Sequence, residues 1–489
     1  MSTDERARAR NPSHAHGPGT GRRTPHNEPR KNRAGLPQQA GAQVRGVRSM
    51  PITKHSRLVA STIAVVLGAT SLVACGSSDD DKSASSSGPA TLTFWTWAPG
   101  MDKVVDLWNK GPGKQQQITV EVKKQASGDS LITKILTAHK AKKAPDLVQA
   151  EYQALPTLVS NDALADIATE SKDAKSKFAE GVWQQTTLGT DAVYAIPQDI
   201  GPMMFYYRAD LFKKYGLAVP TTWEQFAETA RALKKKAPDK ALTTFSANDS
   251  GLFAGLAQQA GAKWWTSSGD KWKVGIDDAA TRKVADFWGG LVKEGAIDNQ
   301  PMYQPAWNKA LNTGKEIAWV SAVWAPGTLT TAAPQTKGKW AMAPLPQWSA
   351  GENVTGSWGG SSTAVTTDSP HKAAAAKFAA WLNTDPQAVA ALAKESGIYP
   401  ASTSAQTSDA FAQPPAFFSN QSDFYTKASE IAKTTAPSAW GPNVNVAYTS
   451  FNDAFGAAAK NKSDFGAALK TMQDATVADL KKQGFGVAQ

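Results

Sequence analysis

The stretch DAVYAIPQDIGPMMFYYRADLFKKYGLAVPTTWEQF, residues 191–226, passes from an extended segment into two helices. Residues 194–207 are rich in apolar and aromatic side chains and contain two prolines, which is typical of an interrupted strand. The residues that follow predict a short helix, a turn at Gly216 and a long amphipathic helix that the side chain of Thr222 caps. A strand that leads directly into helices indicates an α/β protein.

Strands and helices alternate on both sides of this stretch. The expected elements are a strand at 91–97, a helix ending at Gly111, a strand at 118–125, a helix at 130–143, a strand at 144–151, further alternation over 317–382 and a largely helical end over 417–482. This alternation predicts βαβ units, an α/β fold class and a mainly parallel sheet.

The net charge of +11 is concentrated at the start of the chain. Residues 1–74 hold twelve of the 53 basic residues and three of the 42 acidic ones, so the rest of the 489-residue chain carries 41 and 39. A nearly neutral body without a dense basic stripe gives little electrostatic reason to bind nucleic acid. At roughly 100–200 residues per domain, this body is long enough for two or three domains.

The first 74 residues differ in composition from the rest of the chain. Residues 1–49 are rich in Arg, Pro, Gly, His and Asn, show no hydrophobic period and are expected to be disordered. Residues 50–74 have the layout of a signal peptide, with a basic start and then the apolar run LVASTIAVVLGATSLVA (58–74). We interpret Met50 as the true start, with 1–49 upstream of it; a cytoplasmic extension is the alternative.

Cys75 is the only cysteine and directly follows the apolar run. The sequence LVAC resembles a bacterial lipoprotein box, which implies cleavage before Cys75, attachment of diacylglycerol to its sulfur and acylation of the new amino terminus. Two acyl chains anchor a protein stably in a membrane. Residues 75–90 are too polar to pack and predict a flexible tether. The alternative is a transmembrane helix with an incidental cysteine. The apolar run is near the shortest length that can span a bilayer, which makes this alternative less favourable.

The distribution of tryptophan indicates a ligand. All 17 Trp residues follow residue 90, and several lie in loops or at strand ends beside Gly or Pro. Indole rings in such places offer flat faces for the C–H face of a sugar, and neighbouring Asp, Asn, Gln and Glu offer partners for its hydroxyls. The loop tryptophans are Trp95, Trp97, Trp264, Trp265, Trp324, Trp358 and Trp440.

Motifs for several kinds of chemistry are absent from the sequence. There is no phosphate-binding P-loop and no G-x-S-x-G elbow, and His139 and His371 lie beside lysines in helical contexts typical of a solvated surface. A glycoside hydrolase would need two facing carboxylates, and the sequence leaves Asp146, Glu151, Asp199 and Asp249 open for that role. The same carboxylates would serve equally as acceptors for sugar hydroxyls.

Three segments in this order and spacing resemble the extracellular solute-binding proteins of ABC sugar importers, the group of the maltose-binding proteins. They are 191–226, GKWAMAPLPQW (338–348) and the stretch from GGSSTAV to GIYPAS (359–402). The resemblance covers nearly all of the chain from residue 90 onward. It implies two α/β lobes of the type II periplasmic-binding-protein kind, joined by three crossings, with the ligand in the cleft between them.

The resemblance also implies where the lobes begin and end. The N-terminal lobe is expected over 91–200 and 345–396, and the C-terminal lobe over 201–344 and 397–489. The crossings are expected near 199–204, 341–346 and 395–401.

Ligand-contact positions carry over one at a time. The resemblance nominates Glu151, Tyr152, Asp199, Asn248, Asp249, Trp324, Trp358, Gly359, Gly360, Tyr448 and Asn452, with Gln153 behind the first two. The two glycines would let backbone amides approach the ligand. The maltose-binding protein has a stacking Trp where this chain has Ala150, so that platform is absent. Trp97, Trp264 and Trp265 are expected to pack rather than to bind, although Trp97 could line the rim.

These expectations describe a lipid-anchored, non-enzymatic protein on the extracytoplasmic face of the cell membrane. It would bind a sugar or oligosaccharide, deliver it to the permease subunits of an ABC importer, remain a monomer, and need no cofactor or metal. Two alternatives stay open. One keeps the fold but binds a peptide, polyamine or polyol phosphate, and the other is a secreted glycoside hydrolase.

Overall fold

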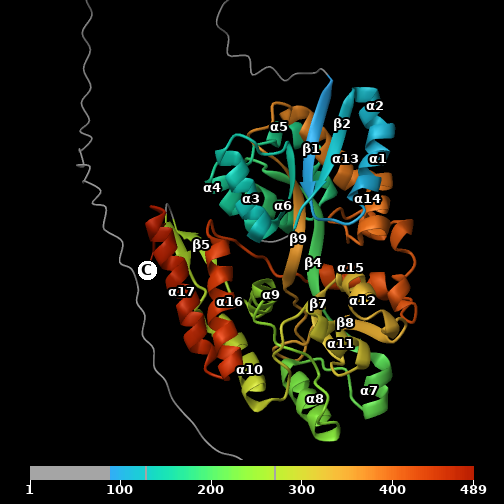
Figure 1. The fold of residues 1–489 in the computed structure, drawn as a ribbon, viewed down its shortest axis with the longest axis vertical. Helices are drawn as coiled ribbons and strands as arrows, with labels where there is room; N and C mark the ends of the chain where they lie inside the picture. Colours follow the sequence, from blue (N-terminus) through green and yellow to red (C-terminus); the bar gives the residue numbers. More distant parts are fainter. Residues whose placement is uncertain (1–88, 127–128, 269–270, 489) are drawn as a thin grey trace, which may run out of the picture. The chain divides into compact units, whose positions relative to one another are not determined.

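A long strand, β4 (Ala195–Arg208), runs between two lobes and belongs to the sheets of both (Figure 1). The computed structural model describes residues 89–126, 129–268 and 271–488. The predicted disordered start, the signal peptide, Cys75 and the tether up to residue 88 lie outside the described residues. The predicted α/β fold class is confirmed.

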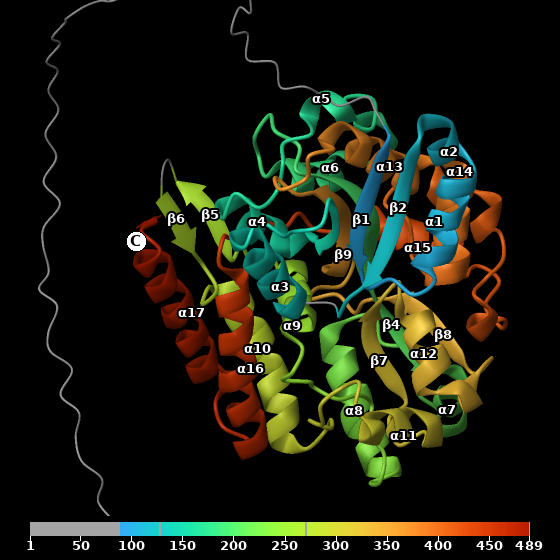
Figure 2. The same cartoon turned by 45° about the horizontal axis from the view of Figure 1, so that its top comes forward.

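The first lobe is built on the strand order β2-β1-β3-β9-β4. Its strands are β1 (Ala90–Thr96), β2 (Ile118–Lys124), β3 (Leu147–Glu151), the end of β9 (Ser357–Val365) and the start of β4. Its helices are α1 (Met101–Lys110), α2 (Pro112–Gln116), α3 (Asp129–Lys140), α4 (Leu155–Ser160), α5 (Ala168–Ser171), α6 (Glu180–Thr187), α13 (Lys372–Thr384) and α14 (Pro386–Ala391). Figure 2 shows these helices on both sides of the strands.

Both faces of this sheet are covered by apolar side chains. On one face, α1 buries Met101, Val104, Val105 and Trp108, which recur at helical spacing. The Trp108 ring meets Phe378 of α13 edge to face, with 5.4 Å between the ring centroids. On the other face, residues of α3 and α4 form a separate buried cluster with β3. The sheet therefore holds its strand ends, including that of β3, in fixed positions.

The second lobe is larger and its core is rich in aromatic rings. Its strands are the end of β4 with β7 (Ala318–Ala322) and β8 (Trp340–Pro344), and a small sheet of β5 (Trp265–Ser268), β6 (Lys271–Val274) and β10 (Gly486–Val487). Its helices are α7 (Ala209–Tyr215), α8 (Trp223–Lys236), α9 (Ser250–Gln259), α10 (Ala279–Glu294), α11 (Pro305–Thr313), α12 (Ala325–Ala332), α15 (Phe424–Ala432), α16 (Val444–Asn461) and α17 (Phe465–Lys482). The predicted cap is confirmed, since the Thr222 hydroxyl accepts from the Gln225 amide at 3.2 Å.

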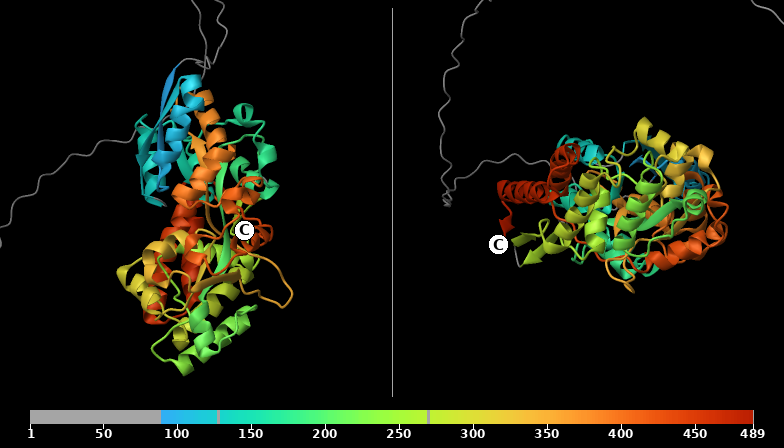
Figure 3. Two further views of the ribbon diagram at one scale, coloured as in Figure 1. Left: turned by 90° about the vertical axis from the view of Figure 1, so that its right-hand side faces the viewer. Right: turned by 90° about the horizontal axis from the view of Figure 1, so that it is seen from below.

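The expectation of a mainly parallel sheet is wrong. β1 runs parallel to β2 and β3, whereas β9 is antiparallel to both β3 and β4. β4 is also antiparallel to β7 and β8. The reason is the direction of travel: β4 leaves the first lobe for the second, and β9 returns from the second lobe to the first. The left view of Figure 3 shows the two lobes one above the other.

The expected second crossing near 341–346 is also wrong. These residues belong to β8, which pairs with β4 from Met204 to Arg208 and so stays in the second lobe. Leu345 and Trp348 then pack with the core of that lobe. The return passage is β9, which pairs with β4 from Ala195 to Pro202. Residues 345–356, expected in the N-terminal lobe, therefore belong to the other lobe.

A third passage lies beside the β4–β9 pair. The Ala401 amide donates to the Gln198 carbonyl at 3.0 Å, and the Ile200 amide donates to the Tyr399 carbonyl at 3.2 Å. Ile398 packs in the core of the first lobe and Tyr399 in that of the second. Three segments thus connect the lobes, a geometry in which rotation about a few residues can open and close the space between them.

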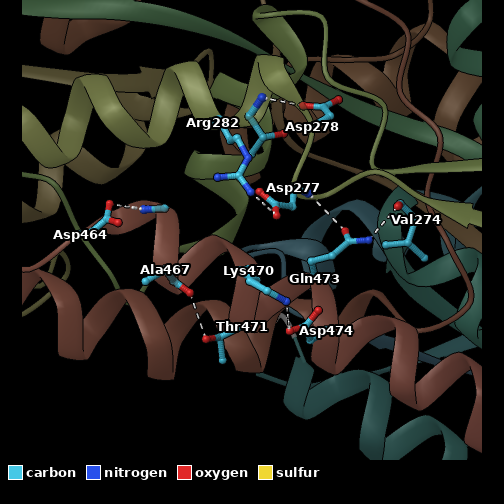
Figure 4. A network of polar contacts seen from close by, with 12 residues as sticks. Val274, Asp277, Asp278, Arg282, Asp464, Ala467, Lys470, Thr471, Gln473 and Asp474 are labelled. Atoms are coloured by element: carbon cyan, nitrogen blue, oxygen red, sulfur yellow. Dashed lines mark hydrogen bonds and ion pairs between the residues drawn. The ribbon is translucent and has the colours of Figure 1, made fainter. Parts of the chain in front are cut away.

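Helix α17 is hydrogen-bonded to the segment between β6 and α10 (Figure 4) and to the start of α16. Gln473 of α17 accepts from the Asp277 amide at 3.2 Å and donates to the Val274 carbonyl at 2.9 Å. The Asn443 side chain, at the start of α16, donates to the Thr476 carbonyl of α17 at 2.9 Å. These contacts fix the orientation of the first turns of α16. Within the described residues, no helix combines the length and apolar character needed to span a bilayer.

Candidate ligand-binding site

A cavity of about 610 Å³ lies between the two lobes. Its volume is within the range of about 300–1,000 Å³ that is usual for small-molecule sites. The eleven residues nominated from the sequence all line it: Glu151, Tyr152, Asp199, Asn248, Asp249, Trp324, Trp358, Gly359, Gly360, Tyr448 and Asn452. The structure brings them together from the end of β3 and the turn after it, from β4, β9 and α16, and from the residues just before α9 and α12. Their contact with a ligand stays a prediction.

Asp199 is held at the crossing by Ser361 of β9. Its Oδ1 accepts hydrogen bonds from the Ser361 amide and hydroxyl, both at 2.5 Å. Gln149 of β3 donates to the same hydroxyl at 3.0 Å. Burial raises the pKa of Asp199 to about 6, and the hydrogen bonds from Ser361 act in the opposite direction.

Gly360 lets Tyr152 pack against the crossing. Its φ of +95° belongs to the left-handed region, and a Cβ at this position would lie 2.9 Å from Cε2 of Tyr152. The Tyr152 hydroxyl donates to the Asp199 carbonyl at 3.0 Å. Its pKa is raised well above the ordinary value by burial and then by the Asp199 carboxylate. The side chain of Tyr152 therefore braces the strand that carries Asp199.

Asp249 stands on the opposite lobe, at the N-cap of α9. Its Oδ1 accepts from the Leu252 amide at 3.0 Å, and the nearby donor groups of Tyr303 and Trp358 favour its ionised form. Gly251 allows the Trp358 ring to approach, since a Cβ there would lie 2.9 Å from the indole nitrogen. Burial raises the pKa of Asp249 to about 7, against the effect of these donors.

Trp324 and Trp358 form one wall of the cavity with the buried Trp319 behind them. Their ring centroids lie 4.8 Å apart with the planes at 78°, and Trp319 meets Trp324 at 5.8 Å. Trp358 is 7% exposed. On the far side, Trp440 meets Tyr448 of α16 nearly at a right angle, with 6.4 Å between centroids. The aromatic surfaces that face the cavity therefore belong to side chains that other aromatic side chains hold in place.

The structure differs from the sequence interpretation at several aromatic positions. Trp97 packs against the buried cluster of α3, α4 and β3, as expected, and also lines the cavity, which the sequence left open. Trp264 and Trp265 are buried outside the cavity, as expected. Tyr303 and Trp440 line the cavity and were not nominated. Tyr303 has no sequence signal: it precedes α11 with a φ of +64°, which is unusual for a bulky residue.

Two glutamines were also missed by sequence reasoning, Gln149 and Gln185, and both line the cavity. Gln153, expected behind Glu151 and Tyr152, lines it as well, and its side chain donates to Glu151 at 2.6 Å. Gln149 could have been found, because it lies two residues before Glu151 on β3 and so shares its face.

The described residues that line the cavity include three carboxylates and no Lys, Arg or His. The carboxylates are those of Glu151, Asp199 and Asp249. These three residues are far apart in the chain, and the fold brings them to one cavity. Among the described residues, no three His, Cys, Asp or Glu side chains gather in a way that could hold a metal ion.

The expectation of a solvated His139 is wrong. Its Nδ1 lies 3.1 Å from an oxygen of the largely buried Asp368. This pair lies in the first lobe, where His139 belongs to α3, and neither residue lines the cavity.

Two α/β lobes that share crossing strands and enclose a polar, aromatic cavity define a two-lobed solute-binding protein. The family model of the bacterial extracellular solute-binding proteins matches residues 95–389, and the chain belongs to this family. This confirms the resemblance inferred from the sequence, and it places the chain among binding proteins of an extracellular family.

Relatives and solved structures agree with this assignment. An arabinooligosaccharide-binding protein of Bacillus subtilis is 24% identical over 331 residues, which cover 65% of this chain and 74% of the relative. A galacto-N-biose-/lacto-N-biose I-binding protein of the ABC transporter of Bifidobacterium longum is 26% identical, with a TM-score of 0.74 over 82% of this chain and 99% of that one. A protein of B. animalis subsp. lactis, solved with β-1,6-galactobiose, is 24% identical with a TM-score of 0.73 over 82% and 100% of the two chains, and shows the shared fold.

Proposed function

We propose that this protein captures a sugar or oligosaccharide in the cavity between its lobes and delivers it to an ABC importer. The observation that carries the proposal is the composition of the cavity wall, in which indole and phenol rings alternate with carboxylates and amides. Rings provide surfaces for the C–H faces of a sugar, and carboxylates and amides exchange hydrogen bonds with its hydroxyls. The relatives named above bind oligosaccharides, which supports the same ligand class here.

Binding would couple to a movement of the lobes. Asp199 and Ser361 lie on the crossing strands, Glu151 on the first lobe, and Asp249 on the second. A saccharide that bonds to both lobes stabilises the closed arrangement, because those bonds cannot all form when the lobes separate. The closed, loaded protein is then the form that the permease subunits would recognise.

The location proposed is the extracytoplasmic face of the cell membrane, with a lipid anchor at Cys75. Its support is the sequence around Cys75 and the extracellular character of the family. Expression with labelled palmitate should label the protein, and Cys75→Ser should abolish the label and release the protein into the medium. Labelling of the Cys75→Ser variant would contradict the anchor.

Saccharide binding is tested by thermal unfolding and tryptophan fluorescence of the purified protein. The panel comprises arabinooligosaccharides, lacto-N-biose, β-1,6-galactobiose and maltooligosaccharides. A saccharide at one hundred times its Kd should stabilise the fold by about 2.7 kcal/mol. The proposal is contradicted if no member of the panel raises the unfolding temperature or changes the fluorescence.

A polyamine is the second candidate ligand, because three carboxylates and several aromatic rings also suit an ammonium group. Spermidine therefore belongs in the same panel. A response to spermidine without a response to any saccharide would favour this alternative. A polyol phosphate is not supported, since no cationic side chain of the described residues lines the cavity.

We further infer that the protein is a monomeric binding protein without catalytic activity, cofactor or metal. Its family and relatives are binding proteins. Incubation with the panel should release no reducing ends. Release that is lost when one of the three cavity carboxylates is removed would instead favour a glycoside hydrolase.

A further inference from the structure

The charged side chains that line the cavity in the described residues are all acidic, which the proposed function does not require. Glu151, Asp199 and Asp249 are the charged residues among the described lining residues, and no Lys, Arg or His lines the cavity beside them. Glu395, which precedes the lining residue Ser396, pairs with Lys103 at 2.5 Å and lies 3.8 Å from the Lys394 ammonium group, and neither lysine lines the cavity. Both lysine side chains are mostly exposed to solvent, at 65% and 82%, so water and salt screen their charges.

Two of these carboxylates are fixed in place by the protein. Both hydrogen bonds from Ser361 fall on Oδ1 of Asp199, which leaves Oδ2 to accept from a ligand. Asp249 is held at the N-cap of α9 by the Leu252 amide, which donates to its Oδ1 at 3.0 Å. Neither carboxylate can turn away from an incoming anion without breaking these bonds, and neither has a cationic partner on the cavity wall to offset its charge.

An anionic ligand would meet a strongly unfavourable field in this setting. The interaction between like charges a few ångströms apart is several times stronger near a protein surface than in water, because the effective dielectric constant is lower. Juxtaposed like charges of this kind are a common means of rejecting wrong partners. A hydroxyl or an ammonium group at the same place would donate to the carboxylates.

We infer that the cavity selects saccharides by charge: it accepts neutral and amino-substituted saccharides and rejects those that carry a carboxylate, sulfate or phosphate. The inference rests on the proposed function and narrows its substrate class. Glu151, Asp199 and Asp249 are the selecting residues. The selectivity lies in the carboxylates themselves and not in the shape of the cavity, so it should follow their number and their ionisation.

Ionisation gives this selectivity a pH signature. The titratable side chains that face the cavity are Glu151, Asp199, Asp249, Tyr152, Tyr303 and Tyr448. The pKa values of Asp199 and Asp249 are raised to about 6 and about 7 by burial, so both groups gain charge between pH 5 and pH 8. A uronic acid is ionised throughout this range. Its disadvantage relative to the neutral sugar should therefore grow as the pH rises.

The test uses an isosteric series. Each saccharide of the panel that carries a terminal hydroxymethyl group is compared with forms in which that group is an aminomethyl group or a carboxylate. The affinities are measured by titration calorimetry of the purified protein at pH 8. We expect the carboxylate form to bind at least about tenfold more weakly than the hydroxyl form, and the amino form to bind as well or better. The ratio should shrink at pH 5.

Variants assign the effect to the named residues. Asp249→Asn and Asp199→Asn should each bring the carboxylate and hydroxyl forms closer in affinity. Asn retains the shape of Asp and also caps helices well, so the start of α9 is preserved in Asp249→Asn. The matched control is Asp453→Asn, an exposed carboxylate of α16 outside the cavity, which should leave the ratio unchanged.

The outcomes separate the inference from the function on which it rests. If hydroxyl and carboxylate forms bind equally well at pH 8, the inference is overturned while saccharide binding stands. If no neutral form binds, both are overturned. A preference for the hydroxyl form that persists unchanged in both Asn variants would also overturn the inference, because the discrimination would then come from cavity shape.

Discussion

The indole Nε1 of Trp324 donates a hydrogen bond to the main-chain carbonyl of Trp358 at 2.9 Å. This bond joins the start of α12 to the start of β9, which is the strand that returns to the first lobe. The two rings therefore act as one wall, and the N–H of Trp324 is committed to the protein. Only the ring face remains for a saccharide.

Trp324→Phe should keep part of the ring face but remove this donor. Loss of one such hydrogen bond lowers the free energy of unfolding by about 1 kcal/mol, and the Trp358 wall should loosen, so saccharide affinity should fall as well. Denaturant unfolding and calorimetry measure the two effects. The control is Trp381→Phe, in a half-buried ring of α13 that packs on Trp108 at 5.2 Å. It should lose stability without losing affinity; equal losses of affinity would count against this role of Trp324.

Gly360→Ala should damage both the fold and the site. The added Cβ would collide with Tyr152, and the residue would be forced to a φ of +95°. A strained backbone position of this kind costs on the order of 1–3 kcal/mol, before the displacement of Tyr152 is included. Thermal unfolding and titration with the best-binding saccharide report the result.

Gly189→Ala is the matched control for this change. Gly189 also has a positive φ, of +76°, but nothing lies within 4 Å of an added Cβ. This variant should show the backbone strain alone and bind saccharide normally. If Gly360→Ala were no more harmful than Gly189→Ala, the close approach of Tyr152 would not matter to the site.

The ligand-free protein should lose stability as the pH rises from 5.5 to 8. Burial raises the pKa values of Asp199, Asp249 and Glu316 to about 6, 7 and 7, so the folded state binds more protons than the unfolded state in this range. Stability that depends on such protons is present at low pH and is lost as the pH passes the folded-state values. The loss should be at least about 1 kcal/mol, as one pKa unit corresponds to about 1.4 kcal/mol. Unfolding that becomes harder towards pH 8 would contradict this assignment.

Glu316→Gln tests whether a buried carboxylate outside the cavity affects stability without affecting saccharide binding. Glu316 is buried in the second lobe, where Gln300 donates to it, and it does not line the cavity. Removing its charge should raise stability at pH 8 and leave saccharide affinity unchanged. Asp249→Asn should also raise stability at pH 8 but weaken binding of a neutral saccharide. If both variants affected binding alike, the cavity would not be the binding site.

Much of the local structure could be predicted from the sequence because its signals are local. The helix ending at Gly111 follows from apolar spacing, and the helix after Thr222 follows from its cap. The mixed direction of the sheet could not be predicted in this way. It depends on β9 returning between the lobes beside β4, which is a contact between residues far apart in the chain.

Some residues of the candidate site could likewise be predicted from the sequence, and others could not. Residues that carry a positional match, such as Asp199 and Trp358, were nominated and do line the cavity. Tyr303 reaches it from an irregular segment whose course depends on tertiary packing, so no pattern indicates it. Trp440 belongs to the loop tryptophans that the sequence singles out, but it matches none of the nominated contact positions. The error at 341–346 has a related cause: β8 and β9 pair with successive parts of β4, and the sequence of either resembles a passage between lobes.

The central claim is that a saccharide binds between the lobes. A crystal structure of the protein with the best-binding member of the panel tests it most directly. The account predicts sugar rings in the cavity, in contact with the Trp324–Trp358 wall and hydrogen-bonded to Asp199 on the crossing and Asp249 on the second lobe. A saccharide bound outside this cavity, with the cavity itself filled by water, would contradict it.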